Sequence, residues 1–203
     1  EYIFIVDSMD PLRRVYDFLS EEYEKFIGFP LVNIPAPNPD GTPNYQGENY
    51  AIHFLNPFLE ALKQIGVNPR VVMNHETYEN GEFAEKIDLA IKNREKIHET
   101  IEKISGRELP ESWYPFNPIG SDGSMDGVTV TRYEKPYVFW TDRNGVNGKS
   151  DIRKAEGKMP WRVDWAAKWG VHRITCEPAG KDHGASGGSY DTGIPICRIL
   201  GGE

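Results

Sequence analysis

The segment Tyr2–Val6 constrains the fold more than any other stretch, because all five residues are apolar and favour β-structure. A short run without polar alternation is typical of a parallel strand that is buried on both faces. Asp7 and Asp10 follow this strand, at the end where open α/β sheets place their ligands. A carboxylate there either faces a nucleotide or caps the next helix, and the sequence leaves both alternatives open.

Helical periodicity dominates the chain as far as residue 105. Apolar residues recur on one face of Tyr50–Ile65, and isoleucines repeat at helical spacing through Gly81–Ser105. A helix over Pro11–Phe26 and a short strand at Val71–Met73 are also predicted. Between them, Gly28–Gln46 holds five prolines, a composition that favours a loop or crossover over a packed element.

The second half of the chain alternates short strands, turns and helices. We expect a small antiparallel knuckle over residues 118–152, because its two β-rich stretches are separated by turn residues. The elements predicted after it are a helix at Trp161–Trp169, a strand at Ile174–Glu177, a glycine-rich loop at Gly180–Gly188 and a helix at Ser189–Leu200. This order predicts an α/β fold with a large insertion between two sheet strands.

Composition limits the classes of protein that fit. A chain of 203 residues is one domain, or one domain with an insertion, and its net charge of −8 excludes a DNA binder that is basic over its whole surface. A local basic patch for RNA remains compatible. No apolar run reaches the length of a membrane span, and Cys176 and Cys197 make no disulfide framework. We expect a cytoplasmic monomer without DNA or membrane partners, and an internal piece of a longer protein.

The densest cluster of polar and glycine residues lies in Glu177–Gly193, where a predicted strand turns into a glycine-rich loop before a helix. Glycines let a backbone approach a ligand closely, and a helix amino terminus favours an anion such as phosphate. Asp182 is suited to accept from ribose hydroxyls, and His183 to donate to a charged oxygen. The segment matches neither the P-loop nor the dinucleotide fingerprint, so a tight structural loop is an equal alternative.

Three tryptophans precede this loop at intervals of four residues: Trp161, Trp165 and Trp169. On a helix they share one face, with Asp164 beside them. An aromatic wall next to a carboxylate suits an alkylammonium ligand. The spacing alone favours a stripe that faces the core. No nucleophilic triad is evident, so no catalytic residue is assigned within this chain.

Several segments together resemble one family. The string from Lys158 through Gly193 resembles the catalytic core of class I lysyl-tRNA synthetases. Tyr45–Gly66 and Glu76–Glu99 resemble helical segments of that family in the same order, and Tyr2–Arg14 lies where its early strand and acidic turn lie. The resemblance implies an α/β fold with a Rossmann-like parallel sheet, a helical insertion and a small antiparallel β-knuckle.

The resemblance also implies a function. The family activates L-lysine with ATP, which carries Mg²⁺ as its counterion, and transfers lysine from lysyl-adenylate to lysine tRNA. Its catalysis rests on positioning and charge stabilisation without a covalent enzyme intermediate. The residues that match the family's adenosine contacts are Gly180, Asp182 and Gly184. Those that match or adjoin its lysine pocket are Asp164, Trp165 and His183. Asp7 and Asp10 are possible nucleotide-facing residues.

On this basis the chain divides into four parts. They are a remnant of the first Rossmann half (1–29), a loop with a helical insertion (30–117), a knuckle like a zinc ribbon (118–152), and the strand, glycine loop and helix of the second half (153–203). The alternatives to a ligase are a non-catalytic nucleotide- or tRNA-binding module and a trimmed scaffold.

The chain departs from the family pattern in three respects. Neither the His-Ile-Gly-His type signature nor the Lys-Met-Ser-Lys-Ser type loop occurs in it, so we expect this chain alone to be weakly active or inactive. The family's knuckle often holds zinc through paired cysteines, whereas residues 118–151 contain no Cys and no His. Tetrahedral zinc needs such ligands, so we predict no zinc and a knuckle held by turn chemistry.

Overall fold

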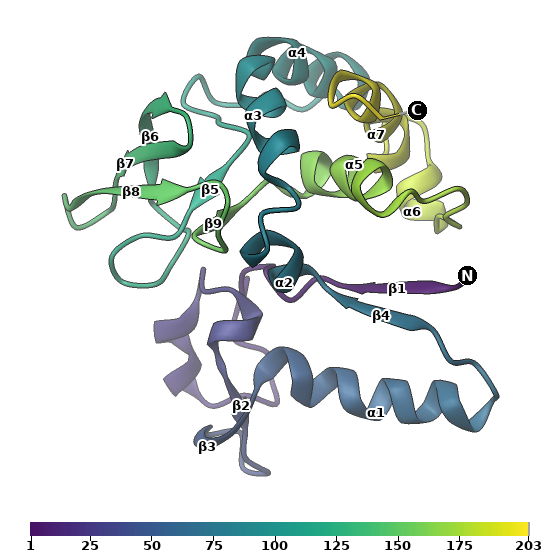
Figure 1. The fold of residues 1–203 in the computed structure, drawn as a ribbon. Helices are drawn as coiled ribbons and strands as arrows, with labels where there is room; N and C mark the ends of the chain where they lie inside the picture. The colour runs from purple at the N-terminus through teal and green to yellow at the C-terminus, as the bar shows by residue number, and fades with distance from the viewer. Residues whose placement is uncertain (203) are drawn as a thin grey trace.

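A pair of parallel strands lies at the centre of the computed structural model, which describes residues 1–202. Strand β1 (Ile3–Val6) runs beside β4 (Arg70–Met73), with Ile3 opposite Arg70 and Val6 opposite Met73 (Figure 1). The predicted parallel strand is therefore confirmed. All four residues of β1 are only partly buried, because β4 is its one strand partner among the described residues. A larger Rossmann-type sheet stays a prediction.

The segment between β1 and β4 forms a layer below the strands in Figure 1. Its elements are the 3-10 helices η1 (Glu21–Phe26) and η2 (Leu31–Asn33), the hairpin strands β2 (Pro35–Pro37) and β3 (Pro43–Asn49), and helix α1 (Tyr50–Gln64). The predicted helix is confirmed in α1. It begins where the side chain of Asn49 accepts a hydrogen bond from the Ile52 backbone N at 3.0 Å, which satisfies one free helix-end donor.

Helices form a second layer above the strands (Figure 1). They are α3 (Ala84–Lys92), α4 (Arg94–Ser105), α5 (Trp161–His172), α6 (Lys181–Gly184) and α7 (Ser189–Ile199), whereas α2 (Asn74–Glu79) lies at the end of β4. Helix α7 packs against both α4 and α5. The main core lies among these helices, and Phe83, Ile97 and Ile196 in it are fully buried. None of the helices within residues 1–202 has the length and apolar character needed to cross a bilayer.

The expected knuckle is present at one side of the molecule. Strands β6 (Thr129–Glu134), β7 (Tyr137–Thr141) and β8 (Asn147–Asp151) form an antiparallel sheet in that order. A short pair, β5 (Asn117–Pro118) and β9 (Gly157–Lys158), connects this sheet to the helical layer. Across the described part of the chain, no three His, Cys, Asp or Glu side chains gather as metal ligands.

The helix expected over Pro11–Phe26 is wrong, because only the single 3-10 helix η1 forms there. The backbone N–H and C=O of Leu12 form hydrogen bonds with a different segment. Its N donates to the Phe29 carbonyl at 2.9 Å, and its carbonyl accepts from the Gly28 N at 2.8 Å. Since these groups pair with a distant segment, they are not available for helical hydrogen bonds.

Three further expectations need correction. The periodic stretch 81–105 forms two helices instead of one, because the Asn93 side chain donates to the Leu89 carbonyl at 2.8 Å where α3 ends. The proline-rich stretch Gly28–Gln46 is not only a loop, since β2 pairs with β3 within it. No strand forms at 174–177, because α5 ends in the left-handed residue Arg173 and the Ile174 N still bonds to the Trp169 carbonyl.

Candidate functional site

The carboxyl ends of the two parallel strands meet at one cluster of polar residues. Ser8 follows β1, and His75 lies in the first turn of α2, directly after β4. The Ser8 Oγ lies 2.8 Å from His75 Nδ1 and accepts from the His75 backbone N at 3.1 Å. Ser8 is fully buried. This side-chain link holds the two strand ends at a fixed separation.

Asp164, in the first turn of α5, is the hub of a buried ionic network. It has no exposed surface. Its carboxylate accepts from Lys168 Nζ at 2.8 Å and from the Tyr78 hydroxyl at 2.5 Å, and Lys158 Nζ lies 3.7 Å away. Lys168 is one helical turn further along α5, whereas Lys158 comes from β9 and Tyr78 from α2. Three separate elements therefore converge on this one carboxylate.

The two lysines carry the network onward to the strand end. Lys168 also pairs with Asp7, and Lys158 with Asp10. Both lysine side chains are 4% exposed, whereas those of Asp7 and Asp10 are 36% and 31% exposed. The result is an alternating chain of charges, Asp7–Lys168–Asp164–Lys158–Asp10, which we call the charge chain. Its three carboxylates exceed its two ammonium groups by one negative charge.

The electrostatics keep Asp164 and Lys168 ionic near neutral pH. Burial would raise the pKa of Asp164, but Lys158, Lys168 and the hydrogen bonds it accepts hold that pKa below its usual value. Burial would lower the pKa of Lys168, but Asp164 and Asp7 raise it instead. Burial dominates at Asp7 and raises its pKa, since Asp7 shares one ammonium with Asp164. Asp7 therefore takes up a proton before Asp164 on acidification.

Asp164 has no accessible surface and is paired with Lys158 and Lys168. Its predicted contact with an alkylammonium ligand stays a prediction. Asp7 and Asp10 do reach open space. They line a cavity of about 810 Å³ beside β1, whose apolar wall includes Phe54 and Phe58 of α1. Whether this space takes a nucleotide stays a prediction.

The tryptophan face of α5 lies next to the glycine-rich loop, as the four-residue spacing predicts. The rings of Trp161 and Trp165 stack with centroids 5.5 Å apart and an interplanar angle of 12°. The His183 ring, on α6, lies 5.9 Å from Trp161 and 5.6 Å from Trp165. Trp165 is only 5% exposed. Trp161 is half-buried and therefore more accessible to a ligand than Trp165.

Glu177 holds the segment that precedes the glycine-rich loop against α5. Its carboxylate accepts from the indole N–H of Trp165 at 2.9 Å and from that of Trp169. Glu177 also lines a cavity of about 420 Å³ between β1 and residues 173–178. The glycine loop is thereby anchored to the same helix that holds the charge chain.

The loop itself is largely open to solvent. Gly180, Asp182 and Gly184 are exposed, and the His183 Nε2 lies 3.7 Å from Asp182 Oδ2. Only Gly187 in this loop adopts a left-handed backbone, with φ of 77°, which favours glycine there. The adenosine contacts expected of Gly180, Asp182 and Gly184 stay predictions.

Helix α5 brings the two groups of candidates together. Lys168, which pairs with Asp7 at the strand end, places its Nζ 5.6 Å from the centre of the Trp161 ring. Trp161 in turn contacts His183 of the loop. Residues from opposite ends of the sequence are therefore connected through two turns of one helix.

The sequence does not predict a place in this site for Tyr78, Lys158, Lys168 or Glu177. Only Lys168 had a readable signal, because it lies four residues after Asp164 within a predicted helix and opposite charges at that spacing meet. Tyr78 and Lys158 come from elements whose placement against α5 no local pattern reveals.

Comparison with known proteins gives a consistent result. A family model described as tRNA synthetases class I (K) matches residues 1–203. The lysine–tRNA ligases of Thermoplasma volcanium and Thermoplasma acidophilum are 44% and 45% identical over 203 residues, which are 100% of this chain and 39% of each relative. The lysine–tRNA ligase of Methanocaldococcus jannaschii is 42% identical over 205 residues, covering 98% of this chain and 37% of the relative. The chain thus spans about two fifths of the length of these relatives.

Proposed function

Because the chain belongs to the family of class I tRNA synthetases (K), we propose that it forms the catalytic-core portion of a lysine–tRNA ligase. The parent protein would activate lysine with ATP to lysyl-adenylate and transfer lysine to its tRNA. The observation that carries the proposal is the similarity to lysine–tRNA ligases, which runs through all 203 residues. Since those relatives are more than twice as long, the complete reaction is proposed only for the whole parent protein.

The geometry around α5 supports a division of roles within this part. Trp161, Trp165 and His183 form an aromatic corner whose ring spacings of 5.5–5.9 Å suit contact with the alkyl chain and ammonium of lysine. Gly180, Asp182 and Gly184 are accessible to the adenosine of the adenylate. Both sets lie on or next to one helix, so they are suited to hold the two halves of one ligand.

In this proposal Asp164 acts as a positioning residue without touching the ligand. Through Lys168 and Lys158 it fixes Asp7 and Asp10, the half-exposed carboxylates at the end of β1. A carboxylate held at a strand end accepts from a ribose hydroxyl or a substrate ammonium without first losing side-chain freedom. The two carboxylates therefore stay candidates for facing the substrates.

The knuckle is proposed to need no zinc. Asp142, in the turn after β7, is 5% exposed, and its carboxylate accepts from the backbone N of Asn144 at 2.9 Å and of Val146 at 3.0 Å. It also accepts from the backbone N of Ser121 at 3.1 Å, which belongs to the facing turn. One carboxylate thus joins two turns, as a metal ion does in a zinc ribbon.

Calorimetric titration with a non-hydrolysable lysyl-adenylate analogue tests the proposal, with the arginyl analogue as the control ligand. We expect selective binding of the lysyl form, and its loss in His183→Ala. The matched control variant is His53→Ala, because His53 is a half-exposed histidine on α1, away from α5. Equal binding of both analogues would contradict lysine specificity. Binding of neither would leave the chain as a non-catalytic module of the family fold.

A further inference from the structure

Trp165 is held by aromatic rings and by a single polar contact. Its ring stacks on Trp161, meets the Trp169 ring at 61° with centroids 5.1 Å apart, and lies 6.3 Å from the Tyr190 ring. The one polar group of its side chain, the indole N–H, donates to the Glu177 carboxylate at 2.9 Å. Since Trp165 is only 5% exposed, loss of this acceptor would leave a buried donor unpaired, which is costly.

Glu177 receives two indole donors and forms no ion pair. One carboxylate oxygen accepts from Trp165 and the other from Trp169. Among the ion pairs formed within residues 1–202, none includes Glu177. Arg198 lines the same cavity of about 220 Å³ but is not paired with it. The negative charge of Glu177 therefore lies against the indoles without a cationic partner.

This arrangement changes how the Trp165 ring interacts with a cation. A hydrogen bond from an indole N–H to a carboxylate is charge-assisted, and it polarises the donor. The ring face becomes more negative, and a negative ring face attracts a cation more strongly. Trp165 also contacts His183, with ring centroids 5.6 Å apart. The charge of Glu177 is thus transmitted to the aromatic corner of Trp161, Trp165 and His183.

We propose that Glu177 is a positioning residue that makes this aromatic corner selective for an ammonium group. Its hydrogen bond fixes the plane of Trp165, and its charge strengthens the attraction between that ring and a cation. Glu177 acts through Trp165 and does not need to touch the ligand. The inference rests on the proposed function for the identity of the ligand, whose ammonium would be that of the lysine side chain.

A purely structural anchor is the competing role for Glu177. The residue comes just before the glycine-rich loop, and its bonds to α5 hold that segment in place whether or not a ligand binds. The two roles differ in their dependence on the ligand. An anchor supports every ligand of the aromatic corner equally, whereas a charge that acts through the ring favours a cation over a neutral side chain.

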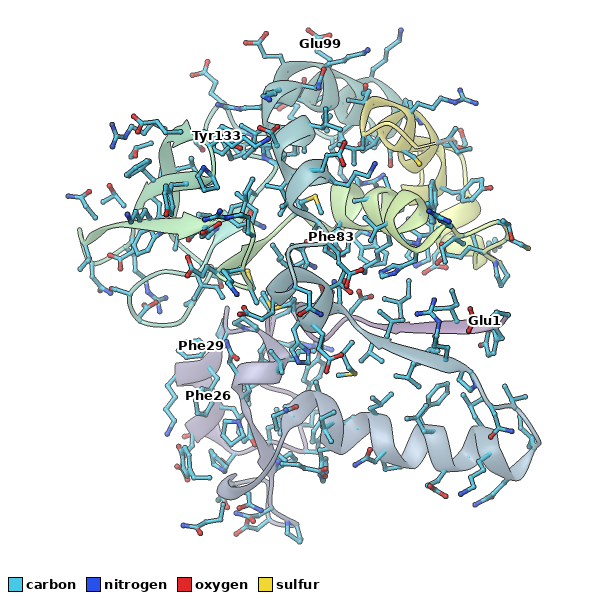
Figure 2. All side chains as sticks on the ribbon, in the orientation of Figure 1. Glu1, Phe26, Phe29, Phe83, Glu99 and Tyr133 are labelled. Carbon is cyan, nitrogen blue, oxygen red and sulfur yellow. The ribbon has the colours of Figure 1, made fainter. Side chains whose placement is uncertain are left out.

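Calorimetric titration of the full chain with two adenylate analogues separates these roles. One carries the lysyl side chain, and the other carries a norleucyl side chain, which lacks the ammonium. Glu177→Gln removes the charge but keeps an amide oxygen that accepts from Trp165. This variant should bind the lysyl analogue about fivefold more weakly, the size of one exposed cation–π contact, and the norleucyl analogue less than about twofold more weakly. Glu99→Gln removes an exposed carboxylate of α4 (Figure 2) and should change neither affinity.

Glu177→Ala removes the charge and the acceptor together. We expect it to weaken both analogues and to change the near-ultraviolet circular dichroism of the tryptophans, because Trp165 is no longer held in one plane. Glu177→Gln should keep that spectrum and the melting temperature of the parent chain. Equal losses for both analogues in Glu177→Gln, or an unchanged affinity for the lysyl form, would overturn the inference. If Glu177→Ala unfolds the chain, Glu177→Gln still decides.

A simpler ligand keeps this inference distinct from the proposed function. If the parent chain binds neither analogue, the proposed lysine pocket fails, and pentylammonium then tests the ring alone by quenching of tryptophan fluorescence. The parent should bind pentylammonium about fivefold more tightly than Glu177→Gln does, and neutral pentanol should not distinguish the two. Equal affinity for pentylammonium would overturn the role of Glu177. Selective binding of the lysyl analogue that Glu177→Gln leaves unchanged would support the proposed function and contradict this inference.

Discussion

Asp164 and Asp88 are both buried carboxylates with similar partners, but the lysines that bind them differ in exposure. Each carboxylate holds two lysines and a tyrosine hydroxyl: Lys158, Lys168 and Tyr78 at Asp164, and Lys92, Lys135 and Tyr133 at Asp88. The two lysine side chains at Asp164 are both 4% exposed, whereas those at Asp88 are 60% and 61% exposed. Both carboxylates are buried, at 0% and 5% exposed, and Asn74 also donates to Asp164. The difference therefore lies in the lysines, which are enclosed at Asp164 and reach the solvent at Asp88.

The two hubs also differ in where their lysines lead. Those of Asp164 continue to Asp7 and Asp10 at the end of β1, whereas those of Asp88 end in solvent. The Asp88 hub is a tie between α3 and the sheet, where Tyr133 lies (Figure 2). Burial of the lysines, and not the list of partners, therefore decides whether such a cluster fixes other groups or only joins two elements.

Removing Lys168 should produce the largest effect. Lys168→Met leaves three carboxylates with one ammonium in a buried site, and breaking a buried pair in this way costs about 3–5 kcal/mol. Urea unfolding at neutral pH measures the free energy of unfolding. The deficit should shrink as the pH falls, because protonation of Asp7 removes one of the unbalanced charges. Lys96→Met, at an exposed position of α4, is the control and should cost less than about 0.5 kcal/mol.

Asp164→Asn should have a smaller effect than Lys168→Met. The variant keeps Lys168 paired with Asp7 and Lys158 paired with Asp10, so no ammonium is left without a carboxylate. It still loses charge-assisted hydrogen bonds, and we expect a cost of about 2 kcal/mol. Affinity for the lysyl-adenylate analogue should also fall, because the lysines that hold Asp7 and Asp10 are no longer fixed by the Asp164 carboxylate. A variant with unchanged stability and affinity would remove the positioning role from Asp164.

The sequence predicted elements whose stability is local. Helix α1 matches the periodicity of Tyr50–Ile65, and α5 that of Trp161–Trp169, because in both the apolar face and the helix boundaries are encoded within a few residues. The expected helix at Pro11–Phe26 failed for the opposite reason. Its backbone forms hydrogen bonds with Gly28 and Phe29, and no pattern inside the segment predicts these partners.

The same limit applies to the candidate site. The contact of Trp161 and Trp165 with His183 could be predicted, since tryptophans four residues apart share a helix face and the loop follows directly. The burial of Asp164 could not. Its ammonium partner Lys158 and its hydroxyl partner Tyr78 are delivered by β9 and α2, and their positions depend on the tertiary fold alone.

Asp88→Asn tests the Asp88 hub through the pH dependence of stability. Burial would raise the pKa of Asp88, but hydrogen bonds from Lys135, Lys92 and Tyr133 outweigh it and lower that pKa from 3.8 to about 2. A carboxyl whose pKa is depressed on folding stabilises above its unfolded pKa and loses this contribution as the pH falls toward its folded pKa. We expect a cost of about 1–2 kcal/mol at neutral pH after screening. The parent and the variant should converge between about pH 4 and pH 2.

Lys92→Gln should have the smallest effect on stability. It tests directly whether the exposure of the lysine separates the Asp88 hub from the Asp164 hub. Asp88 keeps Lys135 and Tyr133 in this variant, and the lost pair joins it to the exposed ammonium of Lys92, four residues further along α3. Such a pair is worth about 0.3–0.5 kcal/mol at low salt. Salt at about 1 M should abolish the difference, because the Debye length there is about 3 Å. The deficit of Lys168→Met should persist in the same salt, since its partners are shielded from the solvent. If Lys92→Gln cost as much as Lys168→Met, or if both deficits vanished together in salt, burial would not be what separates the two hubs.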